Sequence, residues 1–112
     1  MIDRKLGKKE AVYSPSTMKL TPIVNKSITD IPKNLNWING VSWPMWNNDK
    51  IGCCTQVSVA SALRTWSYNT FTEILLTNDN VIKNYSDESG YNGTAASDNG
   101  AIELNVLQKW CK

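Results

Sequence analysis

Residues 43–56 (WPMWNNDKIGCCTQ) hold two tryptophans, a polar turn, a glycine and two adjacent cysteines, and they run straight into a helical pattern. That pattern predicts a helix from about Cys54 to Tyr68, because its apolar residues recur at helical spacing. These residues are Val57, Val59, Ala60, Ala62, Leu63 and Trp66. The small residues among them let other elements approach closely, which favours a central position. The rest of the chain is expected to pack around this helix.

Length and composition indicate a single globular domain. The chain has 112 residues and is 41% apolar, which suits one core and argues against wholesale disorder. The net charge of +2 is too small to indicate a nucleic-acid partner. No apolar run approaches the ~20 residues that span a bilayer, and no apolar segment of signal-peptide length stands at the start. We therefore expect a cytoplasmic protein without a nucleic-acid or membrane partner.

Two residue counts narrow the chemistry. The cysteines are Cys53, Cys54 and Cys111, an odd number that includes neighbours, so a disulfide scaffold is not expected. A single bridge from Cys111 to Cys53 or Cys54 stays open. The chain has no histidine, the commonest general base and metal ligand. Because three cysteines alone do not complete a four-ligand zinc site, we expect no metal and no other cofactor.

Proline spacing divides the chain in two. Residues 1–33 are expected to form an extended arm lying over the domain, because prolines recur among their polar residues: Pro15, Pro22 and Pro32. Residues 34–112 are expected to form a helical lobe. Near its start, Asn39-Gly40 indicates a turn.

Two further helices are expected in this lobe. Thr77 has the side chain of an N-cap and Gly90 is placed to end that helix. Its buried stripe is expected to consist of Val81, Ile82 and Tyr85. Ser97 or Asp98 is expected to cap a third helix, whose apolar face carries Ile102, Leu104, Val106, Leu107 and Trp110. The predicted fold class is therefore mainly α with about three helices, and the lack of a C-cap after Trp110 fits a truncated or split protein better than a complete one.

Cys54 is the candidate nucleophile. A cysteine attacks as its thiolate, and the free N–H groups at a helix N-terminus favour negative charge. Gly52 allows the backbone to bend tightly beforehand. The Asn48 amide and the Cys54 backbone N–H can together donate to an oxyanion. This order of groups suits acyl transfer through a thioester, although a single cysteine near a helix start more often just fills a core.

The same residues resemble the opening of papain-like cysteine peptidases. The residues that carry this resemblance are Ile31–Trp37, Val41, Pro44, Asn48 and Gly52-Cys53-Cys54. Asn48 replaces the oxyanion glutamine of that family, and Thr55 stands where the family has tryptophan. A group of uncharacterised papain-like proteins from bacteria and their phages, which carry Met-Tyr-Gly-Asn-Asp, two residues and then Gly-Asp-Cys-Thr, looks closer. Similarity to that group spans about Pro32–Trp110.

This resemblance implies the helical lobe of a papain-like α+β fold, with Cys54 as nucleophile and Asn48 as oxyanion donor. The neighbours of the implied site are Trp46, Asp49, Gly52 and Cys53. In the family, the histidine and its Asn or Asp partner come from a second, sheet-rich lobe, and this chain ends before any such lobe. The implied function is a cysteine-peptidase-like domain, either a histidine-less relic or a fragment that acts on a peptide-like substrate only with a second lobe or another chain. The likeness to phage proteins leaves a virion-associated location open.

The tryptophans support an alternative function. Most of them are expected to be buried anchors, with Trp46 the best candidate for partial exposure beside the site. The alternative is a non-catalytic binding or structural module, in which the cysteines only pack. It would hold a partner through the Trp43–Trp46 loop and the exposed face of the last helix. The acidic residues are scattered, and no pair has the spacing of a glycosidase or metal site.

Overall fold

The computed structural model describes residues 7–15 and 33–111. Within these residues the chain forms three helices and no strand: α1 (Cys54–Asn69), α2 (Asn78–Ser89) and α3 (Glu103–Trp110). The mainly α fold class predicted from the sequence is confirmed. None of the helices in the described ranges is long and apolar enough to cross a membrane.

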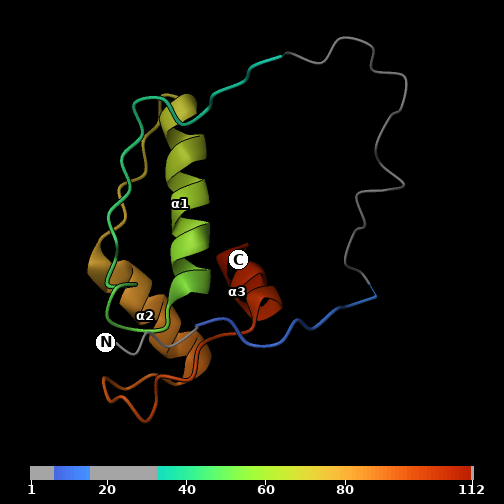
Figure 1. Cartoon of the computed structure of the whole chain (residues 1–112), viewed down its shortest axis with the longest axis vertical. Coiled ribbons are helices and arrows are strands. Elements are labelled where there is room, and N and C mark those ends of the chain that lie inside the picture. Colours follow the sequence, from blue (N-terminus) through green and yellow to red (C-terminus); the bar gives the residue numbers. More distant parts are fainter. Residues whose placement is uncertain (1–6, 16–32, 112) are drawn as a thin grey trace.

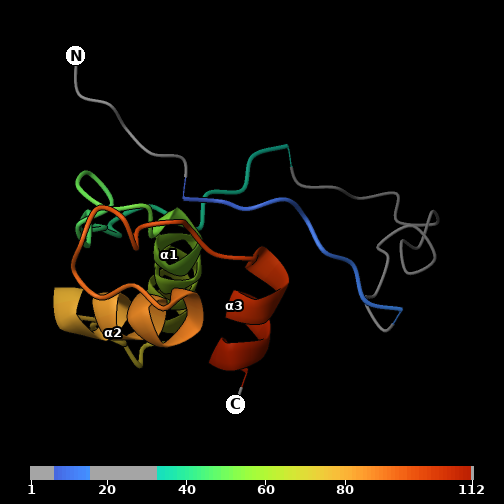
Figure 2. The same ribbon diagram turned by 90° about the horizontal axis from the view of Figure 1, so that it is seen from below.

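The first helix lies between the other two. Both α2 and α3 contact α1, and Figures 1 and 2 show them on opposite flanks of its N-terminal half. The loop from residue 33 runs back along the rest of α1: Asn69 donates to the Trp37 carbonyl at 2.8 Å, and Arg64 donates to the Ser42 carbonyl. This arrangement places the start of α1, with its two cysteines, where all three helices converge.

The limits of α1 agree with the prediction, but its apolar face is wider than the core that receives it. The helix runs from Cys54 to Asn69, and Thr70 follows as the C-cap. Ala60 is fully buried, whereas the indole of Trp66 is 65% exposed. The predicted apolar face is therefore buried only in part, because neither α2 nor α3 reaches far enough along α1 to cover Trp66.

The capping signals of α2 are confirmed. The Thr77 hydroxyl accepts the Asn80 N–H at 3.2 Å, and the Asn80 side chain accepts the Thr77 N–H at 3.0 Å. Gly90 ends the helix in the left-handed region at φ 76°, and its N–H donates to the Ser86 carbonyl. Such reciprocal capping satisfies donors that the first turn leaves free. Of the predicted buried stripe, Val81 and Tyr85 are fully buried, whereas Ile82 is only half-buried.

The predicted cap of α3 is wrong. The helix begins at Glu103 after Ile102, which has extended backbone and makes no side-chain cap. Ser97 instead closes a turn with Asn92, and Asp98 is buried and binds other parts of the chain. Val106 is buried as expected, whereas Leu107 is 46% exposed.

A small core and one buried amide hold the helices together. The core residues are Trp46, Cys53, Ala60, Val81, Tyr85, Ala101 and Val106. Gln56 on α1 is fully buried; its side-chain oxygen accepts the Trp110 indole N–H at 2.6 Å, and its nitrogen donates to the Asn84 carbonyl at 3.4 Å. Since a buried amide needs partners, Gln56 fixes α3 and α2 on α1 at once.

The part of the predicted arm that the structure describes is extended. Residues 7–15 contain no helix, and Lys8 forms an isolated parallel bridge with Ala101. Pro22 and Pro32 lie outside the described residues, and the boundary between residues 33 and 34 stays a prediction. The turn at Asn39-Gly40 is confirmed: Gly40 has φ 83°, and the Val41 N–H donates to the Ile38 carbonyl at 3.1 Å.

Candidate functional site

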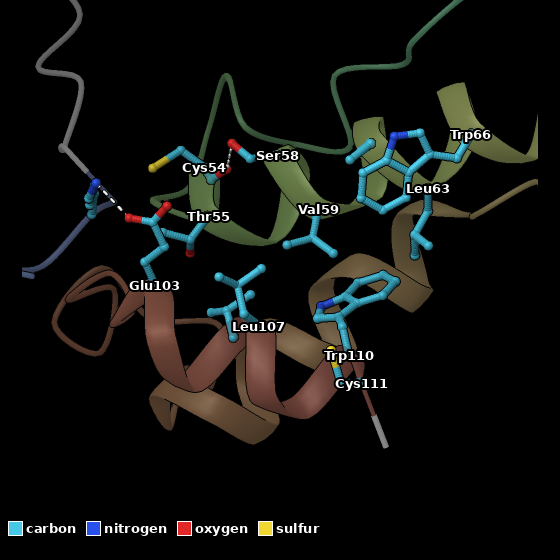
Figure 3. A pocket seen from close by; sticks show the side chains of 13 residues that line it. Cys54, Thr55, Ser58, Val59, Leu63, Trp66, Glu103, Leu107, Trp110 and Cys111 are labelled. Carbon is cyan, nitrogen blue, oxygen red and sulfur yellow. Dashed lines mark hydrogen bonds and ion pairs between the residues drawn. The ribbon is translucent and has the colours of Figure 1, made fainter. Parts of the chain in front are cut away.

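Cys54 is the first residue of α1 and lies in the wall of a cavity. Its side chain is half-buried and its thiol is free. The cavity has a volume of about 420 Å³ and is bounded mainly by apolar side chains of α1 and α3. Figure 3 shows Cys54 at one end, next to Thr55 and Glu103, and Trp66, Trp110 and Cys111 at the other. Cys54 thus lies at one end of a mainly apolar cavity, with its sulfur pointing away from the apolar side chains that line the rest of it (Figure 3).

The N-terminus of α1 has no side-chain cap in the described part of the chain. Cys53 precedes the helix without a side-chain cap, and the first helical bond runs from the Val57 N–H to the Cys53 carbonyl at 3.1 Å. The N–H groups of the first turn therefore have no capping side chain among the described residues. Such groups attract negative charge, so they can donate to an oxyanion that forms beside Cys54.

Cys53 differs from its neighbour in environment. It is fully buried in the core, and its Sγ donates to the Trp46 carbonyl at 3.7 Å. Burial raises the pKa of the Cys53 thiol from 9.0 to about 11. Because only the thiolate attacks, Cys53 is an inert structural residue at neutral pH.

Trp46 is the most buried tryptophan among the described residues, which corrects the prediction that it is partly exposed. Its ring is 1% exposed and its indole N–H donates to the Leu76 carbonyl at 3.0 Å. It reaches the core because the backbone turns through two successive left-handed residues, Trp46 at φ 44° and Asn47 at φ 64°. Trp37 at 58% and Trp43 at 39% are the exposed tryptophans of this region, and Trp66 is exposed as well, so the prediction that most tryptophans are buried anchors is wrong.

Asn48 lies in the turn that Trp46 anchors. Its backbone N–H donates to the Met45 carbonyl at 2.9 Å, and its side chain is half-buried. No hydrogen bond joins Asn48 to Cys54 in the part of the chain that the structure describes, so its role as an oxyanion donor stays a prediction. Asp49 follows at the exposed tip of the turn.

Gly52 lies in a backbone bend, as predicted, and close packing also requires a glycine there. It does not have positive φ, but a Cβ added to it would lie 2.9 Å from an Asp98 oxygen and 3.1 Å from the Gly7 Cα. Its N–H donates to both Asp98 carboxylate oxygens at 3.0 Å. Asp98 thereby fixes the backbone two residues before Cys54.

Tyr85 completes this anchor, which the sequence analysis missed. The Tyr85 hydroxyl donates to Asp98 at 2.6 Å and accepts the Gly100 N–H at 2.9 Å. Burial, and then the hydrogen bond to Asp98, raise the pKa of Tyr85 to about 12. The sequence does show an aspartate, Asp98, in a glycine-containing loop. It was interpreted as a cap of the third helix, so its contacts with distant residues were not predicted.

Two polar features lie at the Cys54 end of the cavity. Lys8 forms an ion pair with Glu103 at 2.6 Å, marked in Figure 3 by the dashed line that ends at Glu103. Thr55 is 7% exposed, and its hydroxyl has no hydrogen-bond partner in the described ranges. The cavity is therefore apolar along its length and polar only where Cys54 lies.

The described residues hold no group of three or more histidine, cysteine or acidic side chains that could bind a metal ion. All three cysteines are free thiols, so the Cys111 bridge left open by the sequence is not formed.

Comparison with known proteins gives no relative for this chain: no protein-family model, no curated protein and no solved structure matches it.

Proposed function

We propose that this chain is the helical, nucleophile-bearing lobe of a papain-like cysteine peptidase fold, and that it acts on peptide-like acyl compounds with a base supplied by a second lobe or another protein. The observation that carries the proposal is the position of Cys54. This half-buried cysteine lies both at an uncapped helix N-terminus and at one end of an apolar cavity.

The two adjacent cysteines have separate roles in this proposal. Cys53 is buried and its raised pKa keeps it protonated, so it anchors the loop in the core. Cys54 is one residue further on and half-buried. The sulfur of Cys54 would attack a carbonyl carbon, forming a C–S bond while the bond to the leaving amine breaks. The amine leaves with a proton from the external acid–base group, and water then hydrolyses the thioester.

The anchors around Cys54 support its role because a nucleophile must be held in one position. Gly52 is bound by Asp98, and Cys53 by burial against Trp46. The backbone N–H of Cys54 is the first donor for the oxyanion, and we assign the Asn48 amide as the second. Asn48 lies in the turn fixed by buried Trp46, only a few residues before the helix.

The general base is missing from this chain. It contains no histidine, and the ammonium of Lys8, which lines the same cavity, is paired with Glu103. That ion pair raises the pKa of Lys8 above its ordinary value of 10.5, so Lys8 stays protonated and does not accept a proton at neutral pH. The base therefore comes from outside these helices.

A non-catalytic binding module is the second candidate, and one observation favours it. Large apolar side chains are exposed at several places, including Trp37, Met45, Trp66, Phe71 and Leu75, and a partner that covers neighbouring ones among them would remove this apolar surface from water. Trp46 cannot be the residue that contacts a partner, because it is buried. Met45 and Trp43 remain available on that loop.

Site-resolved alkylation tests the nucleophile. The chain is treated with iodoacetamide between pH 5 and 9, and each cysteine is quantified by peptide mass spectrometry. We expect Cys54 to react faster than the exposed Cys111 below about pH 7, where unperturbed thiols, which titrate near ~8.5, are almost entirely protonated. Cys54→Ser is the matched control: it should remove the fast reaction and leave the Cys111 rate unchanged. Equal, slow reaction of Cys54 and Cys111 would favour the binding module.

A further inference from the structure

The described part of the arm makes backbone hydrogen bonds beside Cys54. The Ala101 N–H donates to the Gly7 carbonyl at 2.8 Å, and the Lys9 N–H donates to the Ala101 carbonyl at 3.0 Å. These two bonds flank Lys8 in a parallel bridge. Adding an extended segment to an exposed backbone edge is a common way in which proteins bind peptides.

Sterics at this place select glycine. Gly7 is buried, and a Cβ added to it would lie 1.9 Å from the Gly52 carbonyl oxygen, a backbone atom that cannot rotate away. On the other side, a Cβ added to Gly100 would lie 2.3 Å from the Gly7 oxygen. Three glycines thus meet, and only a residue without a side chain fits between the Gly52 loop and the Gly100 loop.

Charge selects the next residue. Lys8 reaches Glu103 at the start of α3, with 2.6 Å between ammonium nitrogen and carboxylate oxygen. Lys9 is exposed, and its contribution to the bridge is its backbone N–H. The contacts therefore favour a glycine at the first position and a basic residue at the second. At the third position, occupied by Lys9, only the backbone N–H takes part.

We propose that Gly52, Gly100, Ala101 and Glu103 form a binding site for an extended peptide with the pattern glycine–basic residue, which residues 7–9 of the same chain fill. Lys8 lines the cavity that contains Cys54, so the bound arm closes part of the approach to that sulfur. This control of Cys54 rests on the proposed function, whereas the peptide site itself does not.

Displacing the arm in the full chain tests the site. Gly7→Ala forces the arm away from Gly52, and circular dichroism confirms that the helices remain. A fluorescein-labelled hexapeptide of residues 7–12 is then titrated by fluorescence anisotropy. We expect saturable binding to this variant, at least about tenfold weaker binding when the peptide carries alanine at its first position, and about two- to fivefold weaker binding when glutamine replaces its first lysine. The wild-type chain, whose own arm fills the site, should bind the hexapeptide more weakly than the variant.

A second variant covers the case in which Gly7→Ala does not fold. Lys8→Glu keeps the glycine and places a carboxylate against Glu103, so it should release the arm and expose the same peptide site. Equal affinity for the glycine and alanine hexapeptides, or no binding to either folded variant, would overturn the proposal.

Alkylation of Cys54 in the same samples separates the two proposals. Its rate should rise several-fold when the arm is displaced and fall when the hexapeptide is added. Selective peptide binding with a Cys54 that reacts no faster than Cys111 in any sample would leave the peptide site standing and refute the nucleophile. Fast alkylation that the arm and the hexapeptide do not change would refute the control of Cys54 by the arm.

Discussion

Asp98 accepts the backbone N–H of Gly52 through both carboxylate oxygens, each at 3.0 Å, across 46 residues of sequence. The same carboxylate accepts the hydroxyl of Tyr85 on α2 at 2.6 Å. One buried charge thus joins the loop before the candidate nucleophile to a second helix and to the loop that leads into α3.

We expect Asp98→Asn to destabilise the protein by about 2–4 kcal/mol, because an amide offers a single acceptor oxygen and no charge to these donors. Urea denaturation followed by circular dichroism measures the change. Asp49→Asn, at the exposed tip of the neighbouring turn, is the matched control and should change stability by less than about 0.5 kcal/mol. Equal effects of the two substitutions would show that the Gly52 contact contributes little.

The three thiols should differ in reactivity according to their burial. Cys53 is fully buried, Cys54 half-buried and Cys111 exposed. We expect Cys54 and Cys111 to react with a chromogenic disulfide reagent at pH 7.5 under native conditions, and Cys53 to react only after unfolding in urea. Cys53→Ala should leave the native count of reactive thiols unchanged. A third thiol that reacts within minutes in the native chain would contradict the buried position of Cys53.

Stability should decline in alkaline solution. Burial raises the pKa of Cys53 from 9.0 to about 11, so above pH 9 the unfolded chain loses this proton while the folded chain keeps it. The protonated Cys53 thiol therefore stabilises the folded chain by on the order of 2 kcal/mol below pH 9, and this stabilisation is lost as the pH rises to about 11. Tyr85, whose pKa rises from 10.0 to about 12, extends the loss to higher pH. Urea midpoints at pH 8, 9, 10 and 10.5 measure the slope, and Cys53→Ala should make it shallower between pH 9 and 10.5.

Local signals predicted the helices well. The limits of α1 and the capping box and glycine stop of α2 follow from side chains within a few residues of each other, so the sequence contains all that determines them. The predicted start of α3 was wrong because an aspartate such as Asp98 can either cap a helix or bind distant parts of the chain. A cap would bind the next turn, whereas the structure uses its charge on Gly52 and Tyr85, which are distant in the sequence.

Burial was harder to predict than secondary structure. Trp46 lies in a polar turn and Trp66 in a predicted apolar helix face, yet Trp46 is 1% and Trp66 65% exposed. The difference arises from the left-handed turn at Trp46 and Asn47 and from the short reach of the helices along α1. Likewise, nothing local indicates that Gly7 packs on Gly52. The position of Cys54 at a helix start could be predicted because it is a local pattern, whereas the cavity beside it includes residues that are distant in the sequence, such as Lys8 and Trp110.

Thr55 provides a last prediction at the candidate site. Its hydroxyl is buried without a hydrogen-bond partner among the described residues, and a buried polar group without a partner costs about 1–3 kcal/mol. Thr55→Val keeps the shape and removes that hydroxyl, so it should raise stability by about 1 kcal/mol. Thr65→Val is the matched control on the same helix: the Thr65 hydroxyl donates to the Ser61 carbonyl at 2.8 Å and accepts the Trp43 indole N–H at 3.3 Å, so its loss should be neutral or destabilising. Thermal denaturation of both variants shows whether each substitution raises or lowers the stability. A clear loss of stability in Thr55→Val would mean that this hydroxyl has a partner in solution, and slower alkylation of Cys54 in that variant would place the partner at the candidate site.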